Sequence, residues 1–449
     1  MTGLARRCAV AVGMAAIIVT GSIPAQADGT VGNVTRFAAG GKVQHPLIDA
    51  DGQGRATATW IRIGREREAW TSDFDGRSWS CPKVLPGSKG ALGYSGATWD
   101  LAEAANGAAV LGGALNSEGA FEGVAVWTRA AAGRPWVQVR WTDPKSFAIL
   151  QRTGPPSVAL TGSTALVSWV SQDSSTGTVF AAKIPVGSTA AITPTVVYSK
   201  SMKGWIDTDP DVGIDAQGNG LIQFEDWVDD ANPLFLTKWP AGGAPATEVL
   251  RDNVLTKDWL TSMHVNAAGQ MISSWGYAPD GAEQYQQFVG FGNSITGLTS
   301  ESVWQSFGGE GVYSYPNTVG SDIDAAGNAS LMLVYENQVI AGQGSVAGGV
   351  GSLAPRAARE VTMGGEGWDV TVTDGRAIVS LENSAGDSLL WELRGSELAT
   401  VATAPGTSAP NSALVKVGGA RVPAMVGTGA GESAFRTNLP TKVGRCGRR

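Results

Sequence analysis

A short segment that recurs roughly every fifty residues constrains the fold of this chain more than any other feature. Each copy has an apolar stretch, a tight turn containing glycine, and a second apolar stretch that often ends in an aromatic residue. The clearest copies span residues 46–60, 210–224 and 322–335. A repeat of this length encodes one supersecondary unit, which buries its apolar face on neighbouring copies. The sequence therefore predicts a repeat architecture and says much less about the ligand.

The repeat divides residues 44–436 into eight units, each interpreted as four short strands. The eighth unit ends before its fourth strand. The segment Val31–Phe37 precedes the first unit and has no other partner, so we expect it to supply that strand and remove two exposed edges. This arrangement is an all-β propeller of eight four-stranded blades over residues 28–440, followed by a tail at 441–449. Seven blades is the alternative.

The first 27 residues have the pattern of a secretory signal peptide rather than of the fold. Arg6 and Arg7 give a positively charged N-terminal region, Cys8–Ile23 forms a mostly apolar region, and Ala25–Ala27 forms a cleavage site of small residues. No later apolar run reaches the roughly 18 residues that a membrane span needs. We therefore expect a secreted, extracellular protein, with a retained signal anchor as the alternative.

The charge balance narrows the classes of partner. The chain has 33 basic and 40 acidic side chains, and two of the arginines lie in the predicted leader, so the mature charge is −9. An acidic chain without a basic stripe disfavours nucleic acid and anionic membranes as partners. We expect a monomer.

Two cysteines, Cys81 and Cys446, remain after removal of the leader. An even pair in an oxidising compartment predicts one disulfide. In a closed ring, this bond would join the first blade to the segment that follows the last. Two unpaired thiols are the alternative.

Turns between the first and second strands of the units carry acidic or amide residues beside glycine, as at Asp49–Gly52, Asp215–Gly218 and Asp324–Gly327. Glycine supplies the positive φ of a tight hairpin, and Asp or Asn side chains bond their own backbone two residues on. We interpret these acids as turn residues rather than as Ca²⁺ ligands.

The repeat, read as Pro-x-apolar-x-apolar-Asp-Ala-x-Gly-Asn, resembles secreted bacterial β-propeller proteins that are distantly sialidase-like in fold. The residues that carry the resemblance are Pro46–Trp60 with Trp79–Pro82, Pro210–Phe224 and Asp322–Tyr335. The resemblance implies the fold and no catalytic residue, because propellers host many unrelated activities.

Loops that join one unit to the next repeat an aromatic–acid theme, and a propeller gathers such loops on one face. Aromatic faces beside carboxylates suit sugars, since the ring stacks and the acid accepts hydroxyl hydrogen bonds. The alternative is that the aromatic residues are wedges between blades. The predicted ligand-binding residues are Trp99, Asp100, Trp205, Asp207, Asp258, Trp259, Tyr313, Tyr315, Trp368 and Asp369.

The fourth unit has the densest group of acids. Such a group is a solvated rim, a Ca²⁺ site or an acid/base pair. His264 is a further candidate base, although a lone histidine in a strand is more often structural. No cofactor is required, with Ca²⁺ as the open alternative. The weak catalytic candidates are Asp207, Asp209, Asp226, Asp229, Asp230 and His264, and the same five aspartates are the candidate Ca²⁺ ligands.

These features lead to one main hypothesis and two alternatives. The main hypothesis is a secreted binding propeller that recognises a carbohydrate or a cell-envelope protein through its aromatic and acidic loop face. The first alternative is a glycan-active enzyme, either a glycoside hydrolase or a polysaccharide lyase. The second is an interaction scaffold that binds no small ligand.

Overall fold

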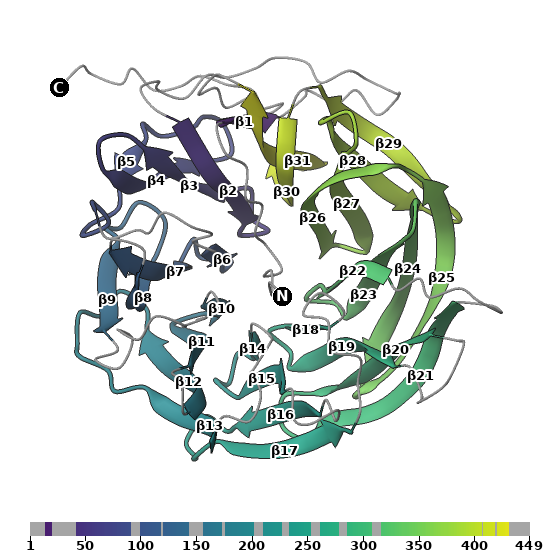
Figure 1. Ribbon diagram of the computed structural model, residues 1–449, viewed down its shortest axis with the longest axis horizontal. Helices are drawn as coiled ribbons and strands as arrows, with labels where there is room; N and C mark the ends of the chain where they lie inside the picture. The colour runs from purple at the N-terminus through teal and green to yellow at the C-terminus, as the bar shows by residue number, and fades with distance from the viewer. Residues whose placement is uncertain are drawn as a thin grey trace.

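The structure is a computed structural model. It describes residues 14–19, 42–90, 99–117, 120–142, 156–172, 176–201, 210–226, 233–252, 261–277, 285–307, 316–405, 407–417 and 420–430. The regular elements within these ranges are all β-strands, and no helix within them is long and apolar enough to span a membrane. Figure 1 shows the sheets arranged radially around a central axis. The predicted all-β propeller is confirmed.

Seven sheets have four strands each, and the strands of each sheet follow chain order from the centre outward. The first four of these blades are β2 (Lys42–Ala50), β3 (Ala56–Ile63), β4 (Arg67–Phe74), β5 (Lys83–Val84); β6 (Trp99–Glu103), β7 (Ala109–Ser117), β8 (Ala120–Arg129), β9 (Val137–Thr142); β10 (Ser157–Thr161), β11 (Thr164–Gln172), β12 (Thr176–Pro185), β13 (Thr195–Ser201); and β14 (Asp211–Ile214), β15 (Gly220–Glu225), β16 (Leu234–Trp239), β17 (Ala246–Arg251).

The next three blades repeat the same meander. They are β18 (Ser262–Val265), β19 (Gln270–Tyr277), β20 (Tyr285–Asn293), β21 (Gly297–Phe307); β22 (Pro316–Ile323), β23 (Asn328–Tyr335), β24 (Gln338–Ala347), β25 (Val350–Glu360); and β26 (Met363–Thr373), β27 (Arg376–Asn383), β28 (Ser388–Arg394), β29 (Glu397–Ala404).

The eighth sheet has three strands, in the order β1 (Met14–Val19), β31 (Ala420–Ala430) and β30 (Thr407–Val417). The prediction of eight four-stranded blades is therefore wrong in the last blade: seven sheets have four strands, as the alternative stated, and a smaller sheet follows them. The segment Val31–Phe37, expected to complete this sheet, lies outside the described residues. The strand that pairs with the outer edge of β31 is β1, which lies within the predicted leader. Counting the repeats predicts that the last sheet has an unpaired edge, but it does not predict which apolar segment pairs with that edge.

The ring is closed by contacts between its first and last inner strands. β30 contacts both β26 and β2, and Ala413 and Val415 of β30 share one buried cluster with Val43 and Ile48 of β2. The core is a series of such layers, each filled from two neighbouring sheets. Because each layer needs both of its blades, the fold depends on closure rather than on any single sheet.

The turn residues act as the sequence predicted. In the fourth blade, Asp215 Oδ1 accepts the backbone N–H groups of Gln217 at 2.9 Å and Asn219 at 2.8 Å. Asp324 does the same for the groups at 326 and 328. Gly218 in the first of these turns has a φ of 87°, which explains why glycine recurs there. The acids therefore recur in the repeat because their side chains stabilise the hairpin turns.

Aromatic residues near the ends of the second strands pack within and between blades. Trp169 stacks on Phe180 of its own sheet at 5.6 Å and on Trp141 of the preceding blade at 5.0 Å. Trp275 stacks on Phe288 at 6.0 Å in the fifth blade. Cross-strand and cross-blade pairs of this kind stabilise sheets, so these repeated aromatic residues form packing layers.

Candidate functional site: the central channel

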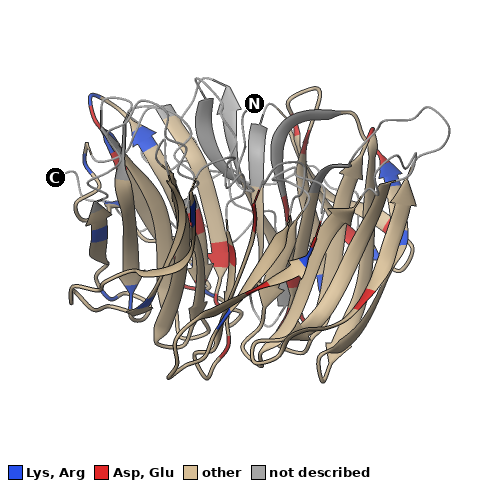
Figure 2. Cartoon of the chain, turned by 60° about the horizontal axis from the view of Figure 1, so that its bottom comes forward, with Lys and Arg blue, Asp and Glu red and all other residues tan. Residues whose placement is uncertain are grey.

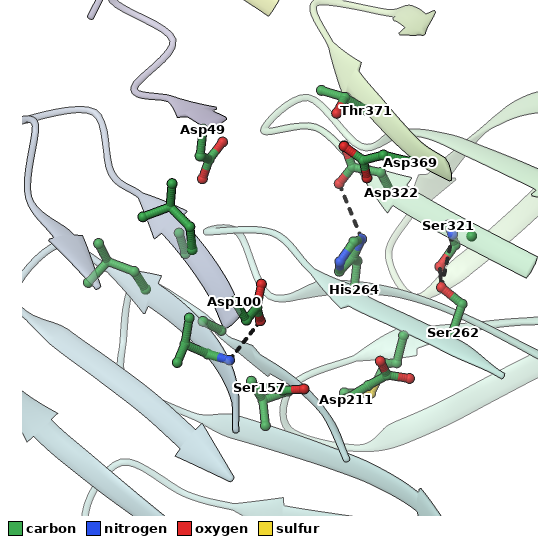
Figure 3. Close-up of a pocket in the computed structure, with 18 of the residues that line it drawn as sticks. Asp49, Asp100, Ser157, Asp211, Ser262, His264, Ser321, Asp322, Asp369 and Thr371 are labelled. Carbon is green, nitrogen blue, oxygen red and sulfur yellow. Dashed lines mark hydrogen bonds and ion pairs between the residues drawn. The ribbon is translucent and has the colours of Figure 1, made fainter. Parts of the chain in front are cut away.

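The inner strands of all eight sheets enclose a cavity of about 330 Å³ on the axis of the ring. The cavity wall comes from β2, β6, β10, β14, β18, β22, β26 and β30. Because side chains alternate along a strand, each inner strand presents every second side chain to this space. Figure 3 shows side chains from several blades converging on it. Radial repetition therefore brings residues more than 300 positions apart in sequence to one site.

Carboxylates are the main charged groups of the wall. Each lies on the inner strand of its blade, one to four positions before the strand ends and the first turn begins. The wall aspartates, each on a different blade, are Asp49, Asp100, Asp211, Asp322 and Asp369.

Four of these aspartates connect their blade to the next one. Asp49 accepts the backbone N–H of Glu103 at 2.7 Å, and Asp100 accepts that of Val158 at 2.8 Å. Asp322 and Asp369 accept the N–H groups of residues 372 and 412, at 2.5 and 3.2 Å. A charge-assisted bond to backbone is among the stronger hydrogen bonds in proteins. The channel acids thus have a structural role as well as lining a cavity.

Replacing Asp100 by alanine is expected to lower the free energy of unfolding by about 1–3 kcal/mol, because it leaves the buried N–H of Val158 without an acceptor. Asp100→Asn keeps an acceptor oxygen and should cost less than the alanine change. Urea unfolding of both variants and the wild type measures this. Equal midpoints for Asp100→Ala and wild type would show that the contact contributes nothing.

His264 faces an acid across the same cavity. Its Nδ1 lies 3.4 Å from Asp322 Oδ1 (Figure 3), and its side chain is 36% exposed. Asp322 is itself fixed, because its Oδ2 accepts the N–H of Val372 and its Oδ1 accepts that of Ile323 at 2.8 Å. A carboxylate held on Nδ1 orients an imidazole and leaves Nε2 for proton transfer. Asp322 lies at ion-pair distance from Nδ1 but makes no hydrogen bond to it, so the two residues have the chemistry of such a pair and not its full geometry.

Glu103 is a second unusual group of the wall. Its side chain is 1% exposed, and its Oε1 lies 3.4 Å from Nη2 of Arg129, which is equally buried. Burial raises the pKa of Glu103 well above its usual range, because it outweighs the opposing charge of Arg129 and the Asp49 carboxylate adds to the rise. Arg129 also forms an ion pair with Asp73, so its charge is shared. With a side chain that is closed off by burial, Glu103 belongs to the interface of the first two blades rather than to the open surface of the cavity.

Three of the predicted site residues lie on this cavity: Asp100, Asp369 and His264. Asp226 does not. It is fully buried at the base of a loop, where it accepts the Tyr198 hydroxyl at 2.6 Å and forms an ion pair with Lys200. Both of its oxygens are thus engaged with the third blade, Oδ2 by the Tyr198 hydroxyl and Oδ1 by Lys200, and its role in a Ca²⁺ or acid/base site of the fourth blade stays a prediction.

The other predicted residues cannot be placed as side chains. Trp99 and Trp368 belong to β6 and β26 by their backbone, and their side chains lie outside the described part. The same part contains no group of three His, Cys, Asp or Glu residues that could hold a metal ion. The remaining predicted residues lie in segments outside the described ranges: Trp205, Asp207, Asp209, Asp229, Asp230, Asp258, Trp259, Tyr313 and Tyr315.

Sequence reasoning missed Asp49, Asp211, Asp322 and Glu103 as residues of the channel. A signal for two of them, Asp49 and Asp322, exists in the repeat, and His264 shares it. Asp49, His264 and Asp322 each lie two residues before the Asp or Asn that caps the first turn, at 51, 266 and 324. Aligning the units on that turn residue places all three on the same face of the inner strand.

No protein-family model matches the chain, and no curated protein matches it. Among solved structures, the polysaccharide lyase Uly1 is similar at 11% identity and a TM-score of 0.42, covering 96% of this chain and 100% of that one. A PL25 ulvan lyase bound to -[GlcA(1-4)Rha3S]- is similar at 12% identity and 0.42, covering 84% and 97%. A chain from a study of two prolyl endopeptidases gives 12% and 0.45, covering 88% of this chain and 54% of that one.

All three TM-scores are below 0.5, so the fold assignment rests on the strand order and not on these likenesses. Two of the three proteins are named as enzymes that act on polysaccharides. None is named as a sialidase, and the resemblance to sialidase-like propellers stays a prediction.

Proposed function

We propose that this protein recognises a carbohydrate at the mouth of its central channel. The observation that carries the proposal is the ring of wall aspartates from different blades around one cavity. Bonds to the next blade hold four of them in fixed positions. Fixed carboxylate oxygens are good acceptors for the hydroxyl groups of a sugar, and they cost little entropy on binding. The aromatic residues of the neighbouring loops remain the predicted stacking partners.

A glycan-array screen of the mature protein, with and without a chelator, tests this function. Binding is expected to be lost in Ser157→Phe, which places a large side chain in the wall of the cavity. Thr296→Phe, in an exposed turn of the fifth blade, is the matched control and should bind as the wild type does. If the wild-type protein binds no glycan in either condition, the interaction scaffold becomes the better hypothesis.

A glycan-active enzyme is the second candidate, and the His264–Asp322 pair favours it. In that case His264 would act as the base. His264→Asn should then reduce turnover by about 100-fold or more while the dissociation constant of the glycan changes little. Comparable turnover in His264→Asn and the wild type would exclude this histidine as the base.

We also propose that the protein is exported, that residues 1–27 are removed together with β1, and that Cys81 is bonded to Cys446. Removal of β1 would leave the outer edge of β31 to the predicted closing segment Val31–Phe37. Cys81 is disulfide-bonded, and its partner lies outside the described residues. The only other cysteine, Cys8, belongs to the predicted leader, which leaves Cys446 for the mature chain. Such a bond closes a very long loop, for which chain-entropy estimates approach about 5 kcal/mol.

Peptide mapping of the exported protein without reduction tests the disulfide and the leader together. The expected result is one bridged peptide pair containing Cys81 and Cys446, and a first residue near Asp28. Free thiols at both positions would contradict the disulfide, and an intact Met1 start would contradict cleavage.

A further inference from the structure

The outer strands of the third to seventh blades each contain a β-bulge, at which one extra residue interrupts the pairing with the neighbouring strand. In β13, β17, β21 and β29 an extra residue is apolar and packs against the buried layer shared with the next blade. These residues are Val197, Leu250, Trp304 and Val401. In the sixth blade the extra residue is Arg356. The repeat therefore places an arginine where the other bulges place a packing residue.

A second packing position of the sixth blade is polar as well. In the fifth blade this position is Phe291, whose ring faces the sixth blade and lies so close to β25 that a Cβ added to Gly351 would come within 2.3 Å of it. The turn caps define the equivalence. Phe291 pairs with the residue at 272, six positions after the cap at 266, and Gln343 pairs with the residue at 330, six positions after the cap at 324. Gln343 thus takes the place of a buried aromatic ring.

These two polar residues line a hollow of about 490 Å³ between the sixth and seventh blades, which we call the interblade groove. It opens on the face of the sixth blade that is turned toward the seventh, since Gln343 Nε2 donates to Gly375 O of the first turn of that blade. Its volume lies within the range of small-ligand pockets, about 300–1,000 Å³. The wall includes Asn328, Gln343, Ser345, Ser352, Ala354 and Arg356.

Two amide side chains of the interblade groove are held in place before any ligand arrives. Asn328 Nδ2 donates to Asp324 Oδ2 at 2.8 Å, and Gln343 Nε2 donates to Gly375 O. The N–H of Gly375 donates to the same Asp324 oxygen at 2.8 Å, so both amides are tied to one turn of the seventh blade. Each amide keeps its oxygen as a hydrogen-bond acceptor. Binding to acceptors that are already fixed costs little side-chain entropy.

Arg356 is the only charged residue of the groove wall. Its side chain is exposed, and no described acid forms an ion pair with it. Arg359, three residues on, is committed to the seventh blade, because it donates to Leu398 O at 2.7 Å and lies over Trp391 at 4.3 Å. Figure 2 shows the Lys and Arg positions of the described part scattered over the molecule, without a continuous basic face in that view. A guanidinium in a polar hollow can bind a carboxylate or a sulfate through two parallel hydrogen bonds.

We propose that the interblade groove is a second binding site, which takes an acidic sugar residue. The carboxylate or sulfate of the sugar pairs with Arg356, and its hydroxyl groups bond to the amide oxygens and serine hydroxyls of the wall. An acidic sugar carries both kinds of group, whereas an inorganic anion carries only the first. The groove and the central channel share no wall residue, so this inference goes beyond the recognition proposed at the channel.

Calorimetric titration of the mature protein with three tetrasaccharides tests the proposal: galacturonate, its methyl ester and sulfated galactose. At least one of the two acidic tetramers is expected to bind tenfold or more tightly than the methyl ester, which keeps the ring hydroxyls without the charge. The tighter of the two identifies the anion. Arg356→Val gives the bulge the residue type that the seventh blade has there, and it should weaken the acidic complex at least tenfold. Arg134→Gln, which changes an exposed arginine of the second blade, should leave that complex unchanged.

Two further variants locate the site. Gln343→Phe fills the groove as Phe291 fills the equivalent place in the fifth blade, so it should abolish binding while the thermal midpoint stays at or above that of the wild type. Ser157→Phe obstructs the central channel and should leave the affinity for the acidic tetramer unchanged. No binding of either acidic tetramer, or equal affinity for all three, would overturn the proposal. Binding that is unchanged in Arg356→Val, or that is lost in Ser157→Phe alone, would place the anion elsewhere and overturn it as well.

Discussion

Replacing Arg129 by methionine is expected to lower the free energy of unfolding by about 3–5 kcal/mol, the range observed when one partner of a buried ion pair is removed. Arg129 is buried on β8 of the second blade, and it forms an ion pair with Asp73 of the first. It also donates to Thr57 of the first blade and stacks over Trp136 at 5.0 Å. Methionine fills the space of the stem but leaves these acceptors without a donor.

The matched control is Arg134→Met, which removes an exposed arginine from the same blade and should change stability little. Arg129→Lys should recover only part of the loss, because an ammonium cannot reproduce the planar fork that reaches both blades. Chemical denaturation of the three variants gives the comparison. A loss below about 1 kcal/mol for Arg129→Met would show that the pair does not stabilise the blade interface.

Acidification is expected to destabilise the protein through His45, with a loss that builds up as the pH falls from 6.5 to about 4. Burial, helped by the charge of Arg67, lowers the pKa of His45 to about 4. Between those values the unfolded chain binds a proton at this residue and the folded chain does not, so falling pH favours unfolding. The loss of stability corresponds to about 3 kcal/mol, and it is nearly complete at pH 4 and zero above pH 6.5.

His45→Asn tests this prediction without adding backbone strain. His45 has a φ of 49° at an irregularity of β2, and asparagine tolerates that region better than most residues. Urea unfolding at pH 4, 5, 6 and 7 should show a flatter profile for this variant than for the wild type. His264→Asn, which changes the other histidine, should keep the wild-type slope. Parallel profiles for His45→Asn and the wild type would contradict the assignment.

The turns and the aromatic ends of the strands can be predicted from the sequence, because they depend on interactions between residues close together in the chain. The turn at Asp215–Gly218 forms by side-chain bonds to residues two and four positions on, and an isolated segment already contains both partners. The aromatic ends of the second strands, such as Trp169 and Trp275, follow the same logic, since strand pairing sets their neighbours. Predicting these features requires only the sequence of one unit.

The candidate site could not be predicted in this way, because its residues come from different blades and come together only in the closed ring. Asp100 and Asp369 were chosen from loops for their aromatic neighbours, and both are bound to the backbone of the following blade. Asp226 looked equivalent in the sequence, yet it is buried in an ion pair with Lys200. Asp226 follows β15, the second strand of its blade, whereas Asp100 and Asp369 lie on inner strands. Which strand holds an acid decides whether it can face the channel, and the sequence gives strand boundaries only approximately.

The sequence alone determined a repeat of four-stranded units closed into a propeller, because the period, the glycine turns and the alternating apolar residues are local properties of each unit. Only the tertiary structure decided that the eighth sheet takes β1 as its third strand, and that acids from five blades line one cavity. The physical reason is that both features depend on closure of the ring. Which edge is paired and which side chains meet on the axis depend on contacts between segments hundreds of residues apart, and no pattern within one unit encodes them.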